Sequence, residues 1–174
     1  AHSVEHGYMM DEECVQSLLE REVWYVPTLA ITHLTPGQAT SDAEKRWVEE
    51  KQLAPDLVRR ADAAAEEHRT WFQTALRAGL RMALGSDIRP LRESALLEMG
   101  LWVKDGATPW QTLLAATRDA AALCGRERDL GTVAVGKFAD LIAVAGDPLE
   151  DIQNLRSLLL VIKEGQVVSD KRGR

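Results

Sequence analysis

The sequence predicts an α/β fold in which short buried strands alternate with helices. Three apolar stretches, over residues 2–6, 23–26 and 80–84, have the length of strands, and each leads through loop-forming residues into a helical pattern. This alternation is typical of parallel sheets connected by helices. After residue 130 the chain changes to short β-rich segments joined by Gly-containing turns. We therefore expect two domains, residues 1–130 and residues 131–174.

Capping residues and apolar spacing set the expected elements. Helical regions are predicted over 12–22, over 42–78 with an interruption at Pro55, over 93–104 and over 109–124. In the second unit, a strand or an extended arm with a turn is predicted over 131–137, a strand over 139–144, and a hairpin over 158–168. Glu164-Gly165 is expected to form the turn of this hairpin.

Composition and charge restrict the classes of function. The chain has 174 residues, of which 45% are hydrophobic and 28% charged, as in an ordinary globular protein. Its net charge of −6 does not favour nucleic-acid binding, which needs clustered lysine and arginine. No apolar run reaches the roughly 18–20 residues that span a bilayer, and no signal peptide is visible. Cys14 and Cys124 lie far apart without a paired-cysteine motif, which favours a reducing, cytoplasmic location.

The strongest candidate for chemistry is Asp87, which ends the string Gly85-Ser86-Asp87. Because it follows an apolar run, its carboxylate is expected at the C-terminal end of a buried strand, where parallel α/β folds place their chemistry. His6 stands at the end of the first predicted strand. A histidine and an aspartate at the same end of parallel strands can share a metal ion. In the alternative interpretation, Asp87 caps the following helix and His6 is an ordinary loop residue.

The remaining histidines have competing interpretations. Residues His2 to His6 spell H-x-x-E-H, which on a helix would bind zinc with its glutamate as general base, but Gly7 follows directly and disfavours a helix. His33 lies in a polar loop, where a solvated side chain is expected. His68 lies on the apolar stripe of a helix, where a hydrogen-bonded structural histidine is expected rather than a ligand.

Motifs spread in order along the chain resemble those of the amidohydrolase superfamily. They are SVEHG at residues 3–7, VPTL at 26–29, GSD at 85–87, AAT at 115–117 with AA at 120–121, GTV at 131–133, GKFADLI at 136–142 and GDPLEDI at 146–152. The tail is similar to the closing segment of the imidazolonepropionase-like and Xaa-Pro-dipeptidase-like branch.

The resemblance implies the C-terminal part, about strands six to eight, of a TIM-like (β/α)8 barrel, followed by the C-terminal strands of a small β-sandwich. A closed barrel takes about 250 residues, so three strand–helix units make only a portion of one. In the family, the His of the sixth strand is a metal ligand, and the Asp ending the eighth binds metal and takes a proton from the bridging water. Those positions match His6 and Asp87.

The family's other ligands are an H-x-H pair after the first strand, a carboxylated Lys or a Glu on the fourth and a His on the fifth. None of these is in this sequence, which is expected to begin at strand six. The loop after Asp87 lacks the Gly-Asn stretch that family members often carry, so substrate contacts stay open.

The residues and the resemblance together leave three candidate functions. The first is a hydrolase of amide-type bonds, in dipeptides or cyclic amides, that uses a divalent metal, zinc first, with Asp87 as base. The second is a catalytically silent structural or assembly fragment, and the third is an H-x-x-E-H zinc peptidase. The expected partner is a small amide or peptide substrate, with neither nucleic acid nor membrane. Open sheet edges also predict self-association or pairing with a missing N-terminal half.

Overall fold

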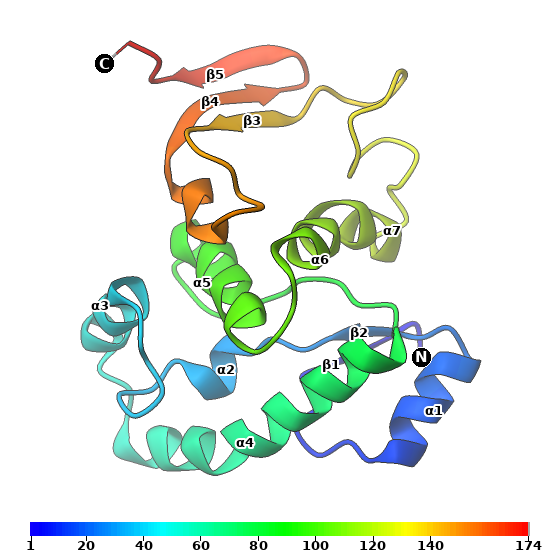
Figure 1. The fold of residues 1–174 in the computed structure, drawn as a ribbon, viewed down its shortest axis with the longest axis vertical. Coiled ribbons are helices and arrows are strands. Elements are labelled where there is room, and N and C mark those ends of the chain that lie inside the picture. The colour runs from blue at the N-terminus through cyan, green and yellow to red at the C-terminus, as the bar shows by residue number, and fades with distance from the viewer. Residues whose placement is uncertain (174) are drawn as a thin grey trace.

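The computed structural model describes residues 1–173, without the side chains of residues 91 and 92. Figure 1 shows a largely helical body, in which the long helix α4 (Pro55–Ala78) crosses one end and a three-stranded sheet lies at the other. Two short parallel strands lie within the helical body, at the end that α4 crosses. No helix within residues 1–173 has both the length and the apolar character needed to cross a membrane.

Three chain segments run parallel in the body. Strand β1 (Ser3–Glu5) pairs with β2 (Trp24–Val26), and Val4 lies opposite Tyr25. The third segment joins β2 through a parallel bridge between Tyr25 and Met82, with the Tyr25 amide donating to the Arg81 carbonyl. The strand predicted over 80–84 is therefore present only as a bridge. A longer strand would need more ladder bonds than the two that Tyr25 makes with this segment.

The helices mostly begin and end where the sequence indicates. In addition to α4 they are α1 (Glu12–Glu20), α2 (Ala30–His33), α3 (Asp42–Lys51), α5 (Leu91–Lys104), α6 (Pro109–Leu114) and α7 (Ala120–Leu123). Ser41 and Thr108 each form a capping box, and Gly79 ends α4 with a φ of 72°. The helix predicted over 109–124 contains a π-helical turn, η1 (Ala115–Asp119), between α6 and α7.

The core lies between β2 and the helices. All three residues of β2 are buried, and Tyr25 is fully so, which explains why this strand is apolar without alternation. Helix α4 turns one face inward, so that Phe72 meets Trp102 of α5 edge to face, with ring centroids 5.1 Å apart. This contact packs α4 against α5.

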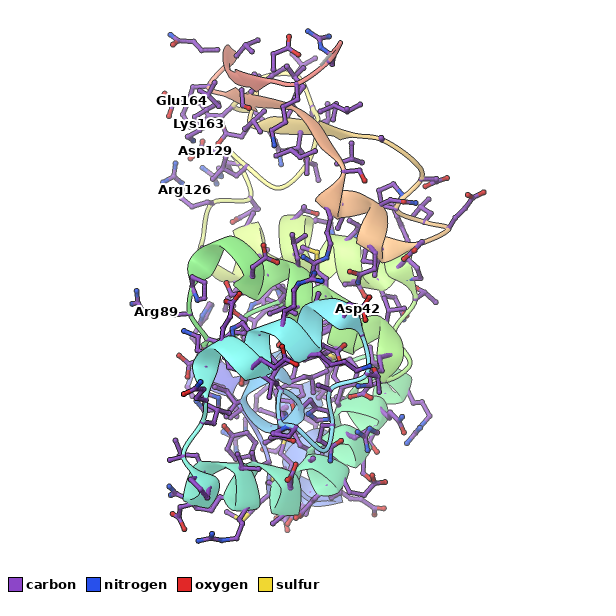
Figure 2. The ribbon with its side chains drawn as sticks, turned by 90° about the vertical axis from the view of Figure 1, so that its left-hand side faces the viewer. Asp42, Arg89, Arg126, Asp129, Lys163 and Glu164 are labelled. Carbon is purple, nitrogen blue, oxygen red and sulfur yellow. The ribbon has the colours of Figure 1, made fainter. Side chains whose placement is uncertain are left out.

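The tail forms an antiparallel sheet of order β3-β4-β5, built from β3 (Leu141–Val144), β4 (Leu158–Lys163) and β5 (Gln166–Asp170), with the short 3-10 helix η2 (Ile152–Arg156) before β4. The hairpin turn is Glu164-Gly165, as predicted, with φ values of 52° and 80°. Figure 2 shows Lys163 and Glu164 on the same side of the molecule as Arg126 and Asp129. Residues 131–137 form an extended arm with turns, which is one of the two predicted alternatives, and no strand. The division at residue 130 stays a prediction.

Candidate active site

The structure brings His6 and Asp87 together. His6 directly follows β1, and Asp87 follows the third parallel segment, so both lie at the C-terminal ends of their strands. The Nε2 atom of His6 is 4.0 Å from Oδ2 of Asp87, and the side chains are 38% and 65% exposed. Asp87 does not cap the next helix, because Pro90 holds that position. The alternative interpretation of Asp87 as a helix cap is therefore wrong.

Thr28 fixes which nitrogen of His6 is free. Its hydroxyl lies 2.7 Å from His6 Nδ1 and donates its one proton to the carbonyl of Pro27 at 2.6 Å. This geometry assigns a proton to Nδ1, which then donates to Thr28. In the neutral ring this leaves a lone pair on Nε2, the atom that faces Asp87. Metal-binding histidines are commonly held in this way by a hydrogen bond at the second nitrogen.

The backbone is unusual at the ends of all three parallel segments. His6, Thr28 and Asp87 have φ values of 67°, 52° and 49°. Side chains disfavour this left-handed region, most strongly when they are β-branched as in Thr28. Such strain costs on the order of 1–3 kcal/mol for each residue and is concentrated at functional sites. Three occurrences around one pair of polar side chains support a site at this end of the sheet.

Gly85 allows the third segment to approach β2. A Cβ atom at this position would lie 2.7 Å from Cγ1 of Val26, closer than packed carbon atoms come. Any larger residue would push apart the two strand ends that carry Thr28 and Asp87. Gly85 therefore contributes to the spacing of the site.

Tyr8 links this pair to the protein interior. Its ring stacks on His6 with centroids 5.4 Å apart and meets His68 edge-on at 5.0 Å. Burial and the nearby charge of Asp87 raise the pKa of the phenol. Sequence analysis missed Tyr8, although its place two residues after His6 was an available signal.

A buried polar chain lies behind Tyr8. The Thr32 hydroxyl lies 2.7 Å from Nδ1 of both His33 and His68. His33 Nε2 is 3.0 Å from Asp105 Oδ2, and Arg69 Nε donates to Asp105 Oδ1 at 3.0 Å. The prediction of a solvated His33 is therefore wrong, since the residue is fully buried on α2. The structural role predicted for His68 is confirmed, and burial, with the adjacent His33, lowers the pKa of His68 to about 4.

Glu98 is another buried acid that sequence analysis missed. It is fully buried on α5 and accepts from the amides of Leu29 and Ala30, both at 2.8 Å, and from Trp102 Nε1 at 3.0 Å. Two of these donors are orphan N–H groups at the start of α2. Burial raises the pKa of Glu98 to about 7, and the three hydrogen bonds oppose the shift. Glu98 thus fixes the loop that carries Thr28 against α5.

The donor chemistry of the pair fits a divalent metal, but the number of donors does not complete a site. Imidazole nitrogen and carboxylate oxygen are both zinc ligands, and catalytic zinc takes three of them from protein. Within residues 1–173 no group of three or more His, Cys, Asp or Glu is placed to hold an ion. The H-x-x-E-H hypothesis is wrong, because residues 3–5 form strand β1 and not a helix. The metal-binding roles of His6 and Asp87 stay predictions.

Comparison with known proteins gives the same family throughout. The sequence model of the Amidohydrolase family matches residues 1–168. Ochratoxinase of Aspergillus niger is 31% identical over 152 residues, which is 87% of this chain. A crystal structure of a Xaa-Pro dipeptidase with methionine bound in its active site aligns with a TM-score of 0.78 at 30% identity and covers 97% of the chain. The crystal structure of A. niger ochratoxinase aligns with 0.78 at 28% identity and covers 99%.

The matches cover only part of each relative. The chain spans 30% of the length of ochratoxinase and 40% of the dipeptidase chain. Its α/β fold is nevertheless that of amidohydrolase structures, which are TIM-barrel proteins. The chain belongs to the amidohydrolase family.

Proposed function

We propose that this chain is the C-terminal portion, about strands six to eight, of a metal-dependent hydrolase of amide-type bonds. The observation that carries the proposal is the placement of His6, whose Nδ1 lies 2.7 Å from the Thr28 hydroxyl and whose Nε2 lies 4.0 Å from Asp87 Oδ2. Relatives named ochratoxinase and Xaa-Pro dipeptidase support an amide or peptide substrate. The length of those relatives supports further ligands on a preceding part of the barrel.

In this proposal His6 and Asp87 would hold a divalent ion, zinc first. Such an ion supplies a lowered pKa for water and polarises a carbonyl group. Asp87 accepts the proton of the attacking water and delivers it to the leaving nitrogen, which is general base and then general acid catalysis. Its 65% exposure leaves the carboxylate open to a substrate on the strand-end face. Thr28 acts as a positioning residue, because it holds the His6 ring.

The proposal is tested on the complete protein that carries this chain. Asp87→Asn is expected to lower kcat for dipeptides by about 10²–10⁴-fold, the usual contribution of a general base. The melting temperature of this variant is expected to equal that of the wild type, because Asp87 caps no helix and is exposed. His6→Asn is expected to lower the bound zinc measured by elemental analysis.

Glu5→Gln is the matched control, because Glu5 is the exposed neighbour of His6. Under the proposal this variant keeps its activity, whereas a zinc peptidase of the H-x-x-E-H type would lose it. Full activity in Asp87→Asn would contradict the proposal.

The silent-fragment hypothesis remains the second candidate for the chain by itself. The observation that favours it is the incomplete set of metal donors within residues 1–173. A cytoplasmic location is likewise a proposal, supported by Cys14 and Cys124, which are both free and exposed.

A further inference from the structure

A largely apolar pocket of about 450 Å³ is lined by Tyr8, which stacks on His6, and by Ile88, which follows Asp87 in the chain. Its volume is within the range of roughly 300–1,000 Å³ that small-molecule sites occupy. Its walls come from the segments that follow all three parallel strands: Tyr8 after β1, residues 30–34 after β2, and Ile88 after the third segment. The pocket therefore lies on the strand-end face, where barrel enzymes bind their substrates.

Tyr8 and Ile88 connect the pocket to the candidate metal ligands. Tyr8 lines the pocket and also stacks on His6 with ring centroids 5.4 Å apart. Ile88 directly follows Asp87 and is buried. The Tyr8 ring therefore separates the pocket from the His6 ring, and the Ile88 part of the wall is joined to Asp87 through the backbone.

The far wall is mostly apolar and is supplied by α3, α4 and the turn between them, with Arg60 of α4 as its charged lining residue. Trp47 of α3 is held by a hydrogen bond from its Nε1 to the Arg89 carbonyl at 3.2 Å. Opposite it, Leu57, Ala61 and Ala64 of α4 present small or aliphatic side chains at helical spacing. The two alanines leave the space that a larger residue would fill.

We propose that this pocket, the α3–α4 pocket, is the specificity site of the proposed hydrolase and takes the apolar side chain, aliphatic or aromatic, of the residue next to the scissile amide. The proposal rests on the proposed function and adds the class of substrate to it. The pocket offers an apolar group mostly carbon-lined walls, with Trp47 and several aliphatic side chains among them. A glycine residue in the substrate would leave it empty.

The test uses the complete zinc-loaded protein and dipeptides that contain leucine or phenylalanine, with glycylglycine as reference. Ala64→Phe fills the α3–α4 pocket and is expected to lower kcat/KM at least about tenfold for the apolar dipeptides, since a single methylene is worth about that much in such a site. For glycylglycine a change of less than about twofold is expected, because glycine makes no use of the pocket. Ala63→Phe is the matched control, because Ala63 is exposed on the same helix and does not line the pocket.

Leu57→Asp is the second variant, in case Ala64→Phe folds poorly. Leu57 is 48% exposed at the rim, so the change places a charge beside the bound apolar group without disturbing the core. It is expected to raise KM for the apolar dipeptides and to leave glycylglycine unchanged. Loss of stability in Ala64→Phe, together with an unchanged preference in Leu57→Asp, would overturn the proposal and show that the pocket is packed by another part of the protein.

A binding measurement separates this proposal from the hydrolase proposal. N-acetyl-L-phenylalaninamide is titrated into the Asp87→Asn variant, and the fluorescence of Trp47 is isolated by comparison with a Trp47→Phe version. Saturable quenching that Ala64→Phe abolishes supports the pocket even if no dipeptide is hydrolysed. Fluorescence that does not respond to the probe would overturn it, whatever the enzyme's activity.

Discussion

Replacing Glu98 by glutamine is expected to change how the stability of the protein depends on pH. Glu98 is fully buried, and its pKa of about 7 in the folded state exceeds the value near 4.5 of an exposed glutamate. Between these two values the folded state binds more protons than the unfolded state. The free energy of unfolding therefore falls as pH rises from about 4.5 to 7.

The magnitude follows from the size of the shift. A difference of about 2.5 pKa units at about 1.36 kcal/mol each corresponds to roughly 3 kcal/mol of stability lost across this range. Burial is the largest cause of the shift, and the nearby charge of Asp105 acts in the same direction, whereas hydrogen bonds from Leu29, Ala30 and Trp102 oppose it. Glu98→Gln does not titrate, so this part of the pH dependence is absent from the variant.

Glutamine at position 98 also lowers the stability of the folded state by an amount that does not depend on pH. It keeps one acceptor oxygen, but its NH₂ group replaces the other and faces a buried N–H donor. An opposed donor of this kind costs about 1–3 kcal/mol. The variant is therefore expected to be less stable than the wild type near pH 4.5, and the gap is expected to narrow or reverse by pH 7.5.

Urea unfolding of the complete protein, followed by tryptophan fluorescence between pH 4.5 and 7.5, measures this gap. The quantity to compare is the difference in unfolding free energy between variant and wild type. His68, whose pKa is lowered to about 4, makes stability rise with pH, opposite to the effect of Glu98, and it does so equally in both proteins. Glu67→Gln, at an exposed position of α4, is the control and should run parallel to the wild type. Parallel curves for Glu98→Gln would refute the reasoning and show that Glu98 titrates normally.

Three further predictions concern the site and the chain. Thr28→Val removes the acceptor for His6 Nδ1 and is expected to weaken zinc binding about 10–100-fold in a metal titration; unchanged affinity would remove Thr28 from the site. Gly85→Ala places a methyl group 2.7 Å from Val26 and is expected to cost about 1–3 kcal/mol in urea unfolding, with partial recovery in the double variant with Val26→Ala; additive losses would contradict this contact. The 174-residue chain produced alone is expected to self-associate in sedimentation, because Ile142 and Val167 are each 58% exposed and the sheet edges are open. It is also expected to lack hydrolase activity, and a compact active monomer would disprove both expectations.

The sequence was most informative where a strand ends. The positions of His6 and Asp87 relative to each other followed from two short apolar segments that each lead into a polar residue, because parallel strands present their C-terminal ends on one edge. Capping residues such as Ser41 and Thr108 likewise set helix boundaries, since their hydrogen bonds are local. These features depend on residues close together in the chain.

The features that sequence analysis missed depend on contacts between distant segments. Helix α2 has four residues, too few for a helical period to be visible, so His33 was placed in a loop. Glu98 resembles any exposed glutamate on a helix until the amides of α2, about 70 residues earlier, are placed against it. The third parallel segment has strand-like composition, but composition cannot show how many ladder bonds its neighbour supplies.

The left-handed backbone at the three strand ends has an evolutionary consequence. Glycine adopts this conformation without the strain of about 1–3 kcal/mol that His6, Thr28 and Asp87 each incur, against roughly 0.5–1 kcal/mol of extra backbone entropy that glycine loses on folding. Selection for stability alone would therefore replace all three side chains. Under the proposed function, a descendant that no longer catalyses the reaction is expected to acquire glycine at these positions before its core changes, so that glycine here would mark a relative that has kept the fold without the reaction.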